Sequence, residues 1–357
     1  MAYVIGACGF CATGSSAITD FLKEFDEVVT FDDFEFTLPY RTDGLQDLRY
    51  HLHEGAVKHN ACWVAIERFR KLCNGYGCRE LKRDTNGKFI QLTKDYLDKI
   101  IQAEWVGTEV HESEEMFRSL CIRTMRKLKL FKYLYSLECK YNIDRAVFPF
   151  RKVTFSTNPD NFDDITKEYV MSVLDALIKE EDKGKSIVLD QPFVGGNPQA
   201  SFPFFENPKA IVMDRDPRDY YVFYKEFLYK KGRRAVPVYN VKNFVTFYRK
   251  ERENMPYLEE HPDILKVQFE DLIYNYEETA KIICDFCNLD FNNRKRKLFD
   301  PALSINNTQV YKRYPQYAAD IKYIEEQLGE YLFPFEKYGE RKISGEMFLG
   351  RSPLNKK

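Results

Sequence analysis

The strongest constraint on the fold is a glycine-spaced loop near the start of the chain. A short apolar run, Ala2 to Gly6, precedes the loop and has the look of a buried strand. Apolar residues at helical spacing follow the loop from Ser16 to Phe25. Between them, the segment Gly9-Phe10-Cys11-Ala12-Thr13-Gly14-Ser15-Ser16 has the spacing G-x-x-x-x-G followed by two hydroxyl side chains. The sequence therefore predicts a strand, a glycine-rich loop and a helix in immediate succession.

This spacing is that of a P-loop, in which successive backbone N–H groups and a helix N-terminus attract a phosphate group. The hydroxyls of Ser15 and Ser16 can add hydrogen-bond donors. Ser15, however, stands where nucleotide triphosphatases carry lysine, and this counts against an ATPase or a kinase. The candidate phosphate-binding residues are Gly9, Ala12, Thr13, Gly14, Ser15 and Ser16.

Further along the chain, short apolar runs alternate with amphipathic segments. Strand-like runs stand at Val28 to Phe31, Ser186 to Asp190, Ala210 to Met213 and Leu265 to Phe269. Helical spacing follows at Arg218 to Tyr229, Val241 to Glu253 and Tyr276 to Cys287. Such alternation predicts an α/β, P-loop-like three-layer fold with a central parallel sheet, whose ligands lie beyond the carboxyl ends of the strands. We expect residues 1–357 to form a single domain, with a mostly helical insertion at 37–183.

Composition narrows the function further. The chain carries 54 basic and 55 acidic residues, so no global positive field favours nucleic acid as a partner. No apolar run approaches the length of a membrane span. Nine cysteines at irregular spacing are not the pattern of a disulfide framework, and we expect a cytoplasmic protein.

A second polar cluster, Met213-Asp214-Arg215-Asp216-Pro217-Arg218-Asp219, comes directly after a predicted strand. Two arginines at a strand's carboxyl end can hold a phosphate by bidentate contacts. Pro217 suits the first turn of the following helix. The alternative is an ion-paired helix start, with Arg218 facing Asp214 or Asp219.

Together, the loop without the P-loop lysine and the distant R-x-P-R-D resemble the sulfotransferase family. Two later segments resemble it as well, Gln268 to Leu272 with the helix that ends at Leu289, and Phe299 to Lys312. The resemblance covers residues 2–31 and about 186–338. It implies that the first loop binds the 5′-phosphosulfate of PAPS, that Arg215 binds the 3′-phosphate, and that the segment around Asn307 and Lys312 closes over the nucleotide.

The chain also departs from the family's pattern. The family usually has Lys or Arg where Ala12 stands, and a serine on the 3′-phosphate where Phe223 stands. A cation from elsewhere must replace the missing one, and the candidates are Arg218, Lys312, Arg313 and the run Lys230–Arg234.

A group that takes the acceptor's proton is also needed. Glycosaminoglycan-type sulfotransferases carry a glutamate after the second strand, and Asp33 matches that position best, with Glu35 second. Sulfotransferases of small phenols use histidine, for which His51, His53 and His59 are alternatives.

The sequence therefore predicts an enzyme that moves a sulfuryl group from PAPS to a hydroxyl or amine of a carbohydrate acceptor and needs no metal. The resemblance is to the carbohydrate-type, bacterial sulfotransferases. The predicted catalytic residues are Asp33 and Glu35, and the residues predicted to hold PAPS are the six of the loop with Arg215, Arg218, Asn307 and Lys312. The alternatives are a P-loop kinase that uses ATP, and a nucleotide- or carbohydrate-binding homologue with weak or no turnover.

Overall fold

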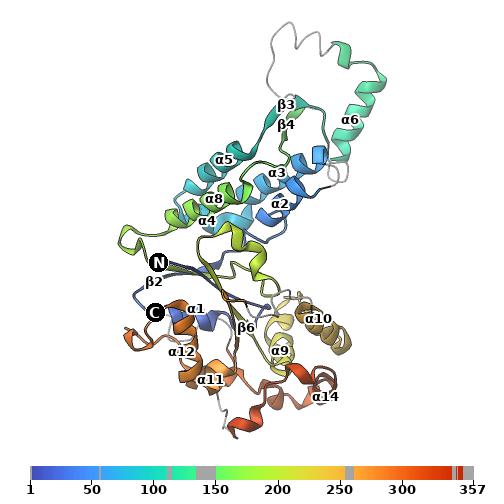
Figure 1. Cartoon of the computed structure of the whole chain (residues 1–357). Helices are drawn as coiled ribbons and strands as arrows, with labels where there is room; N and C mark the ends of the chain where they lie inside the picture. Colours follow the sequence, from blue (N-terminus) through green and yellow to red (C-terminus); the bar gives the residue numbers. More distant parts are fainter. Residues whose placement is uncertain are drawn as a thin grey trace. The chain divides into compact units, whose positions relative to one another are not determined.

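The computed structural model describes residues 2–55, 58–110, 115–133, 150–253, 261–339, 343 and 345–348 (Figure 1). The side chains of residues 32, 33 and 58–60 are outside this description. The chain divides into two compact units, one formed by Met1–Tyr40 with Ile178–Lys357 and the other by Arg41–Leu177. Each unit is described by itself.

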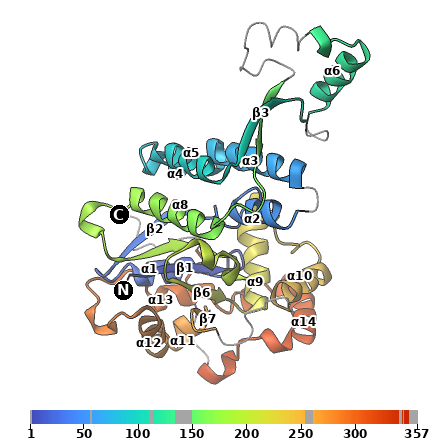
Figure 2. The same ribbon diagram turned by 45° about the horizontal axis from the view of Figure 1, so that its top comes forward.

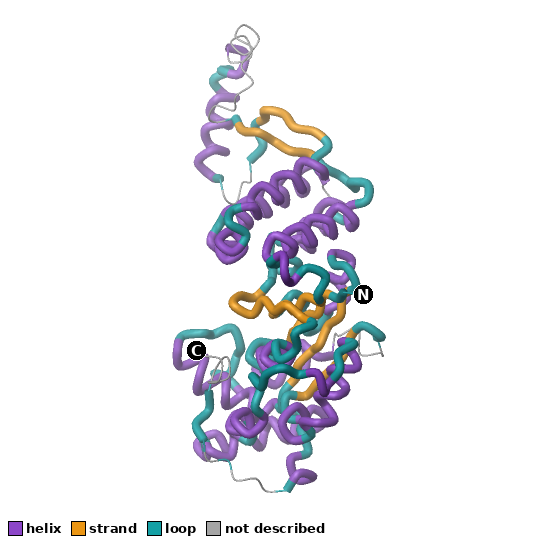
Figure 3. Tube along the Cα trace, turned by 90° about the vertical axis from the view of Figure 1, so that its left-hand side faces the viewer, coloured by secondary structure: helices purple, strands orange, loops and turns teal. Residues whose placement is uncertain are grey.

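The first unit contains a five-stranded sheet in the order β2-β5-β1-β6-β7, in which every neighbouring pair is parallel. Figure 3 draws the strands in orange and the helices in purple. Its strands are β1 (Val4–Gly9), β2 (Val28–Glu35), β5 (Ser186–Asp190), β6 (Pro208–Asp214) and β7 (Ile264–Gln268). The central strands are buried on both faces, which explains why they are continuous apolar runs and do not alternate with polar residues. The predicted α/β fold with a central parallel sheet is confirmed.

Helices flank this sheet and form two apolar clusters. In the first, α1 and α12 pack with β1 and β6 around Ile18, Phe21 and Ile283. The second joins α9, α10 and α14 around Tyr220, Phe244 and Ile324. Figure 2 shows α11, α12 and α13 close together beside the strands. The helices of this unit are α1 (Ser16–Leu22), α9 (Pro217–Phe223), α10 (Val241–Glu253), α11 (Asp271–Tyr274), α12 (Tyr276–Cys287), α13 (Pro301–Ser304) and α14 (Ala318–Gln327).

The second unit is mostly helical. Its core joins α5 and α8, where the rings of Tyr96 and Tyr169 stack with centroids 4.5 Å apart and Thr93 shares a 2.8 Å hydrogen bond with the Tyr169 hydroxyl. Its elements are α2 (Leu45–His53), α3 (Lys58–Asn74), α4 (Arg79–Asp84), α5 (Lys88–Ile100), β3 (Ala103–Gly107), α6 (Met116–Lys127), β4 (Arg151–Phe155) and α8 (Phe162–Leu177).

Three details differ from the sequence-based expectation. The apolar residues of Leu45 to Arg70 have helical spacing throughout and predict one helical stretch, whereas the structure forms two helices there, α2 and α3, with Glu54 and Gly55 outside both. The segments of β3 and β4 pair as an antiparallel two-stranded sheet within the stretch predicted as helical. Strand β2 continues beyond Phe31 to Glu35 through an irregularity in its pairing with β5. Among the helices of the described residues, none is both long and apolar enough to cross a membrane.

Candidate anion-binding and transfer site

The side chain of Thr13 holds the loop between β1 and α1 in place. Its Oγ1 accepts a hydrogen bond from the Phe10 amide at 3.0 Å and donates one to the Met213 carbonyl at 2.8 Å. Thr13 is 1% exposed, so its hydroxyl ties the loop to the neighbouring strand β6 and is not available to a ligand. What Thr13 can offer an anion is its backbone N–H.

The same loop turns through backbone conformations with positive φ. Cys11, Ala12 and Gly14 have φ values of 44°, 64° and 104°. At Gly14 this conformation strongly favours glycine, and an added Cβ would lie 2.6 Å from the Phe269 ring. Glycine is therefore required at this position by both the turn and the packing beneath it.

The turn leaves a row of backbone donors without partners. Within the part of the chain that the structure describes, no hydrogen bond is donated by the amides of residues 11–16. Consecutive free N–H groups in such a turn form a concavity that can accept an anion. Ser15 Oγ accepts a 2.7 Å hydrogen bond from Gln191 Nε2, which fixes that hydroxyl between the loop and the end of β5.

The loop opens into a cavity of about 600 Å³ that lies wholly within the first unit. Its wall combines the predicted loop with the carboxyl ends of β2, β5 and β6. Arg215 and Arg233 are the positively charged residues of this wall, and Asp20, Glu35 and Asp190 are the negatively charged ones. The lining residues are Gly9, Cys11, Ala12, Gly14, Ser15, Ser16, Ala17, Asp20, Glu35, Tyr40, Asp190, Gln191, Val194, Gly195, Arg215, Phe223, Leu228, Arg233, Phe269, Phe299, Ser304, Asn307 and Phe348.

Arg215 follows β6 and is 3% exposed. Its guanidinium donates hydrogen bonds to the carbonyls of Ala12, at 3.5 Å, and Asn307, and lies 4.5 Å from the ring centroid of Phe223. Its Nε is buried without a hydrogen-bond partner. Burial lowers the pKa of Arg215, while the nearby carboxylates Asp219 and Glu270 oppose that shift. A buried donor with no acceptor, on the wall of a cavity, is suited to an anionic ligand.

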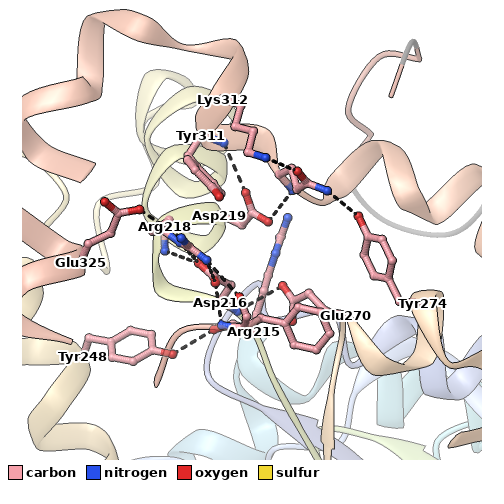
Figure 4. Close-up of polar contacts among 12 residues, drawn as sticks. Arg215, Asp216, Arg218, Asp219, Tyr248, Glu270, Tyr274, Tyr311, Lys312 and Glu325 are labelled. Atoms are coloured by element: carbon pink, nitrogen blue, oxygen red, sulfur yellow. Dashed lines mark hydrogen bonds and ion pairs between the residues drawn. The ribbon is translucent and has the colours of Figure 1, made fainter. Parts of the chain in front are cut away.

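Arg218 occupies a different environment (Figure 4). It forms a two-point ion pair with Asp216, at 3.0 and 2.7 Å, and a further pair with Glu325 at 3.0 Å. Burial disfavours its charge, but the hydrogen bonds and charge of Asp216, together with Tyr311 and Glu325, outweigh burial and raise the pKa of Arg218. Asp216 also caps α9 by accepting from the Arg218 amide. The structure therefore places Arg218 in an ion-paired helix start and not on the cavity wall; the partner is Asp216, where the sequence suggested Asp214 or Asp219.

Asp219 anchors the late segment to the site (Figure 4). The amides of Gln309 and Tyr311 donate to its carboxylate at 2.7 and 3.3 Å. Burial raises the pKa of Asp219 to about 7, with Asp216 adding to the shift and Arg215 opposing it. Lys312 donates to Gln309 Oε1 at 2.6 Å and does not line the cavity. The side chain of Asn307 is bonded to the backbone of Phe348, so Asn307 faces Arg215 with its carbonyl.

The predicted proton acceptors fall at the end of β2. Glu35 lines the cavity, is exposed, and lies opposite Asp190 in the strand register. Asp33 belongs to the same strand, but its side chain lies outside the described part of the structure. His51 and His53 belong to α2 of the second unit, and the side chain of His59 is likewise not described.

Sequence reasoning did not single out three further residues of this wall. Gln191 was visible only as a polar residue at a strand end, and Arg233 only as one member of a basic run. Tyr40 follows the acidic segment with no motif of its own. For Gln191, the signal that could have found it is its position directly after an apolar strand, the same signal that identified Arg215.

Comparisons with known proteins concern the fold. No protein-family model matches the chain, and no curated protein matches it. Among solved structures, the chain is similar to the sulfotransferase domain from the curacin biosynthetic pathway, with a TM-score of 0.43, 14% identity, and coverage of 93% of this chain and 99% of that one. It is also similar to the sulfotransferase domain from the Synechococcus olefin synthase, with a TM-score of 0.40, 14% identity, and coverage of 86% and 87%. The chemistry of the cavity has to follow from its own side chains.

Proposed function

We propose that this chain is a PAPS-dependent sulfotransferase that acts on a hydroxyl or amine of a carbohydrate. The observation that carries the proposal is the combination, in one cavity, of the free amides of residues 11–16 with the buried, partly unpartnered guanidinium of Arg215. A nucleotide with one anionic group on each side of its ribose needs two anion sites that are close but distinct.

The loop suits the 5′-phosphosulfate. Free N–H groups around Gly14 offer several donors to the phosphate and sulfate oxygens, and the hydroxyls of Ser15 and Ser16 line the same wall. Thr13 would act through its amide alone, because its hydroxyl already has two partners.

Arg215 suits the 3′-phosphate. A guanidinium has five N–H donors, and the structure uses two of the Arg215 nitrogens for backbone carbonyls, leaving Nε without an acceptor. The rings of Phe223 and Phe269 lie beside the guanidinium and leave it little water to compete with a phosphate. Arg218 and Lys312 would support this site indirectly, through Asp216 and Gln309.

Sulfuryl transfer also needs a group that takes the acceptor's proton as its oxygen attacks sulfur. Glu35 is the described carboxylate that best fits this role, because it is exposed on the cavity wall at the end of β2. Asp33, two residues earlier, remains the second candidate. A carboxylate and the nearby ring of Tyr40 are side chains that sugars commonly contact, which supports a carbohydrate acceptor.

Titration calorimetry tests the proposal. The chain should bind adenosine 3′,5′-bisphosphate more tightly than ATP with Mg²⁺, and should transfer sulfate from PAPS to members of a glycan panel. Preferential binding of ATP would instead favour a P-loop kinase. Ala12 favours one other alternative, a homologue that binds the nucleotide with little turnover, since the loop itself carries no cation. Binding of the bisphosphate without transfer to any acceptor or to water would support that alternative.

A further inference from the structure

The loop of the candidate site lacks the positive charge that sulfuryl transfer requires. As the bond between sulfur and the bridging oxygen breaks, negative charge develops on that oxygen, and fixed cations stabilise it most effectively. Ala12 offers no charge. Arg215 is already held between the carbonyls of Ala12 and Asn307. The remaining cation on the cavity wall is Arg233.

The chain brings Arg233 to the cavity through an unusual helix end. After α9 ends at Phe223, residues Tyr224–Leu228 form a π-helical turn, a rare element often found at functional sites. Gly232 then reverses the chain with a φ of 86°, and the Arg233 amide donates to the Leu228 carbonyl at 3.0 Å. Leu228 and Arg233 both line the cavity, so this end of the helix forms part of its wall.

The neighbouring cations of the run are committed to other contacts. Lys230 pairs with Glu226 at 2.5 Å. Lys231 lies 5.7 Å from the ring centroid of Phe227. Arg234 lies 4.6 Å from the ring centroid of Tyr229 and donates to its hydroxyl at 3.2 Å.

Arg233 differs from these three. Its guanidinium has no hydrogen bond or ion pair with any residue that the structure describes, and it is exposed on the cavity wall. Cys11 of the loop lines the same cavity. Burial raises the pKa of the Cys11 thiol, Glu35 and Glu251 raise it further, and the positive charge of Arg233 opposes them. Arg233 thus lines the same cavity as the loop and Glu35, the groups that the transfer step would use.

We propose that Arg233 replaces the missing loop cation and is a catalytic residue of the transfer. This inference rests on the proposed function. In the step, the acceptor oxygen forms a bond to sulfur and its proton passes to Glu35. The bond between sulfur and the bridging oxygen breaks, and its electron pair goes to the 5′-phosphate oxygen of the departing adenosine 3′,5′-bisphosphate. Arg233 stabilises the charge on that oxygen.

The test compares Arg233→Ala with the control Arg234→Ala. The control removes an equal charge from the next residue, whose side chain lies against Tyr229. Water serves as the acceptor, so the assay follows release of adenosine 3′,5′-bisphosphate from PAPS by chromatography. Arg233→Ala should lower kcat by about 100-fold or more, the usual cost of removing one transition-state donor, and Arg234→Ala by less than about 3-fold. Arg233→Lys should recover part of the rate, and added guanidinium should partly rescue Arg233→Ala.

Calorimetric binding of the bisphosphate to Arg233→Ala shows whether a lower kcat reflects lost catalysis or, instead, lost folding or lost nucleotide affinity. Its Kd should change by less than about 10-fold in Arg233→Ala, since the effect belongs to the transition state. An unchanged kcat in Arg233→Ala, or losses of equal size in both alanine variants, would overturn the role of Arg233. A wild-type chain that neither binds the bisphosphate nor releases it from PAPS would instead contradict the proposed function, and the inference with it.

Discussion

Replacing Arg215 by alanine should weaken the binding of a nucleotide that carries a 3′-phosphate much more than that of one without it. Under the proposed function Arg215 contacts the 3′-phosphate, whereas the hydrogen bond that the described structure gives it to the loop is the 3.5 Å bond to the Ala12 carbonyl. Adenosine 3′,5′-bisphosphate carries a 3′-phosphate and adenosine 5′-phosphosulfate does not. The two ligands therefore report on Arg215 and on the loop separately.

The size of the effect follows from the contacts. A hydrogen bond to a charged group contributes about 1.5–3 kcal/mol, so two from one guanidinium to a phosphate contribute about 3–6 kcal/mol. Arg215→Ala also removes the positive charge that opposes the raised pKa of the buried carboxyls Asp219 and Glu270, so we expect the variant to be less stable as well. We expect the Kd for the bisphosphate to rise by about 100-fold or more, and that for adenosine 5′-phosphosulfate by less than about 5-fold, because the bond to Ala12 is long.

Calorimetry with both ligands on the same preparation provides the assay, and circular dichroism checks that the variant is folded. Arg215→Lys is the matched control, since it keeps the charge and loses the planar fork, and it should give an intermediate loss for the bisphosphate alone. Equal losses for the two ligands would refute the assignment and make Arg215 a structural tie between the loop and Asn307.

Three further predictions follow from the site. Glu35→Gln should slow bisphosphate release from PAPS by about 100-fold while leaving the Kd of the bisphosphate unchanged; if Asp33→Asn shows the larger loss, Asp33 is the proton acceptor. Folding raises the pKa of Asp219 from 3.8 to about 7. Between these pH values the folded state keeps the Asp219 proton that the unfolded state has lost. The contribution of Asp219 to the unfolding free energy is therefore lost as pH rises from about 4 to about 7. Urea unfolding of Asp219→Asn should accordingly show a smaller decline in unfolding free energy across that range, and an unchanged slope would contradict the cause assigned to the shift. Gly14→Ala should destabilise the chain by about 1–3 kcal/mol and weaken the binding of both nucleotides, because φ is 104° and the added Cβ would meet Phe269 at 2.6 Å; a neutral effect in thermal unfolding would show that the loop relaxes.

Much of the fold could be predicted because its signals are local. The structure gives α10 and α12 the predicted bounds, Val241–Glu253 and Tyr276–Cys287, since each has a continuous apolar stripe. The apolar runs of the sheet are also short-range patterns. By contrast, β3 and β4 pair across the 43 residues that separate Gly107 from Arg151. The strand pattern of Ala103–Gly107 is also too short to stand out within a helical region.

The site could be predicted in part for the same reason. Glycine spacing identified the loop, and position after a strand identified Arg215. What the sequence could not show is which way each polar group points. Thr13 has the residue type of a phosphate ligand but bonds to Met213, and Arg218 has the residue type of an anion ligand but pairs with Asp216. Conversely, Arg233 and Arg234 are adjacent members of one basic run, and the structure shows that Arg233 lines the cavity whereas Arg234 contacts Tyr229.

The contacts around Arg215 connect two segments that would bind different parts of the nucleotide, the loop after β1 and the late segment around Asn307. Arg215 bonds to the loop at Ala12 and to the late segment at Asn307, and Asp219, one turn along α9, holds the amides of that late segment. Asn307 in turn holds the backbone of Phe348 on the cavity wall. The loop and the late segment are thus positioned by one network, whose charged members Arg215 and Asp219 are buried in the folded chain. Such preorganisation lowers the cost of ordering these segments when an anion binds. It also means that substitutions in this network, unlike those at exposed Arg233 and Glu35, should change folding and nucleotide affinity together.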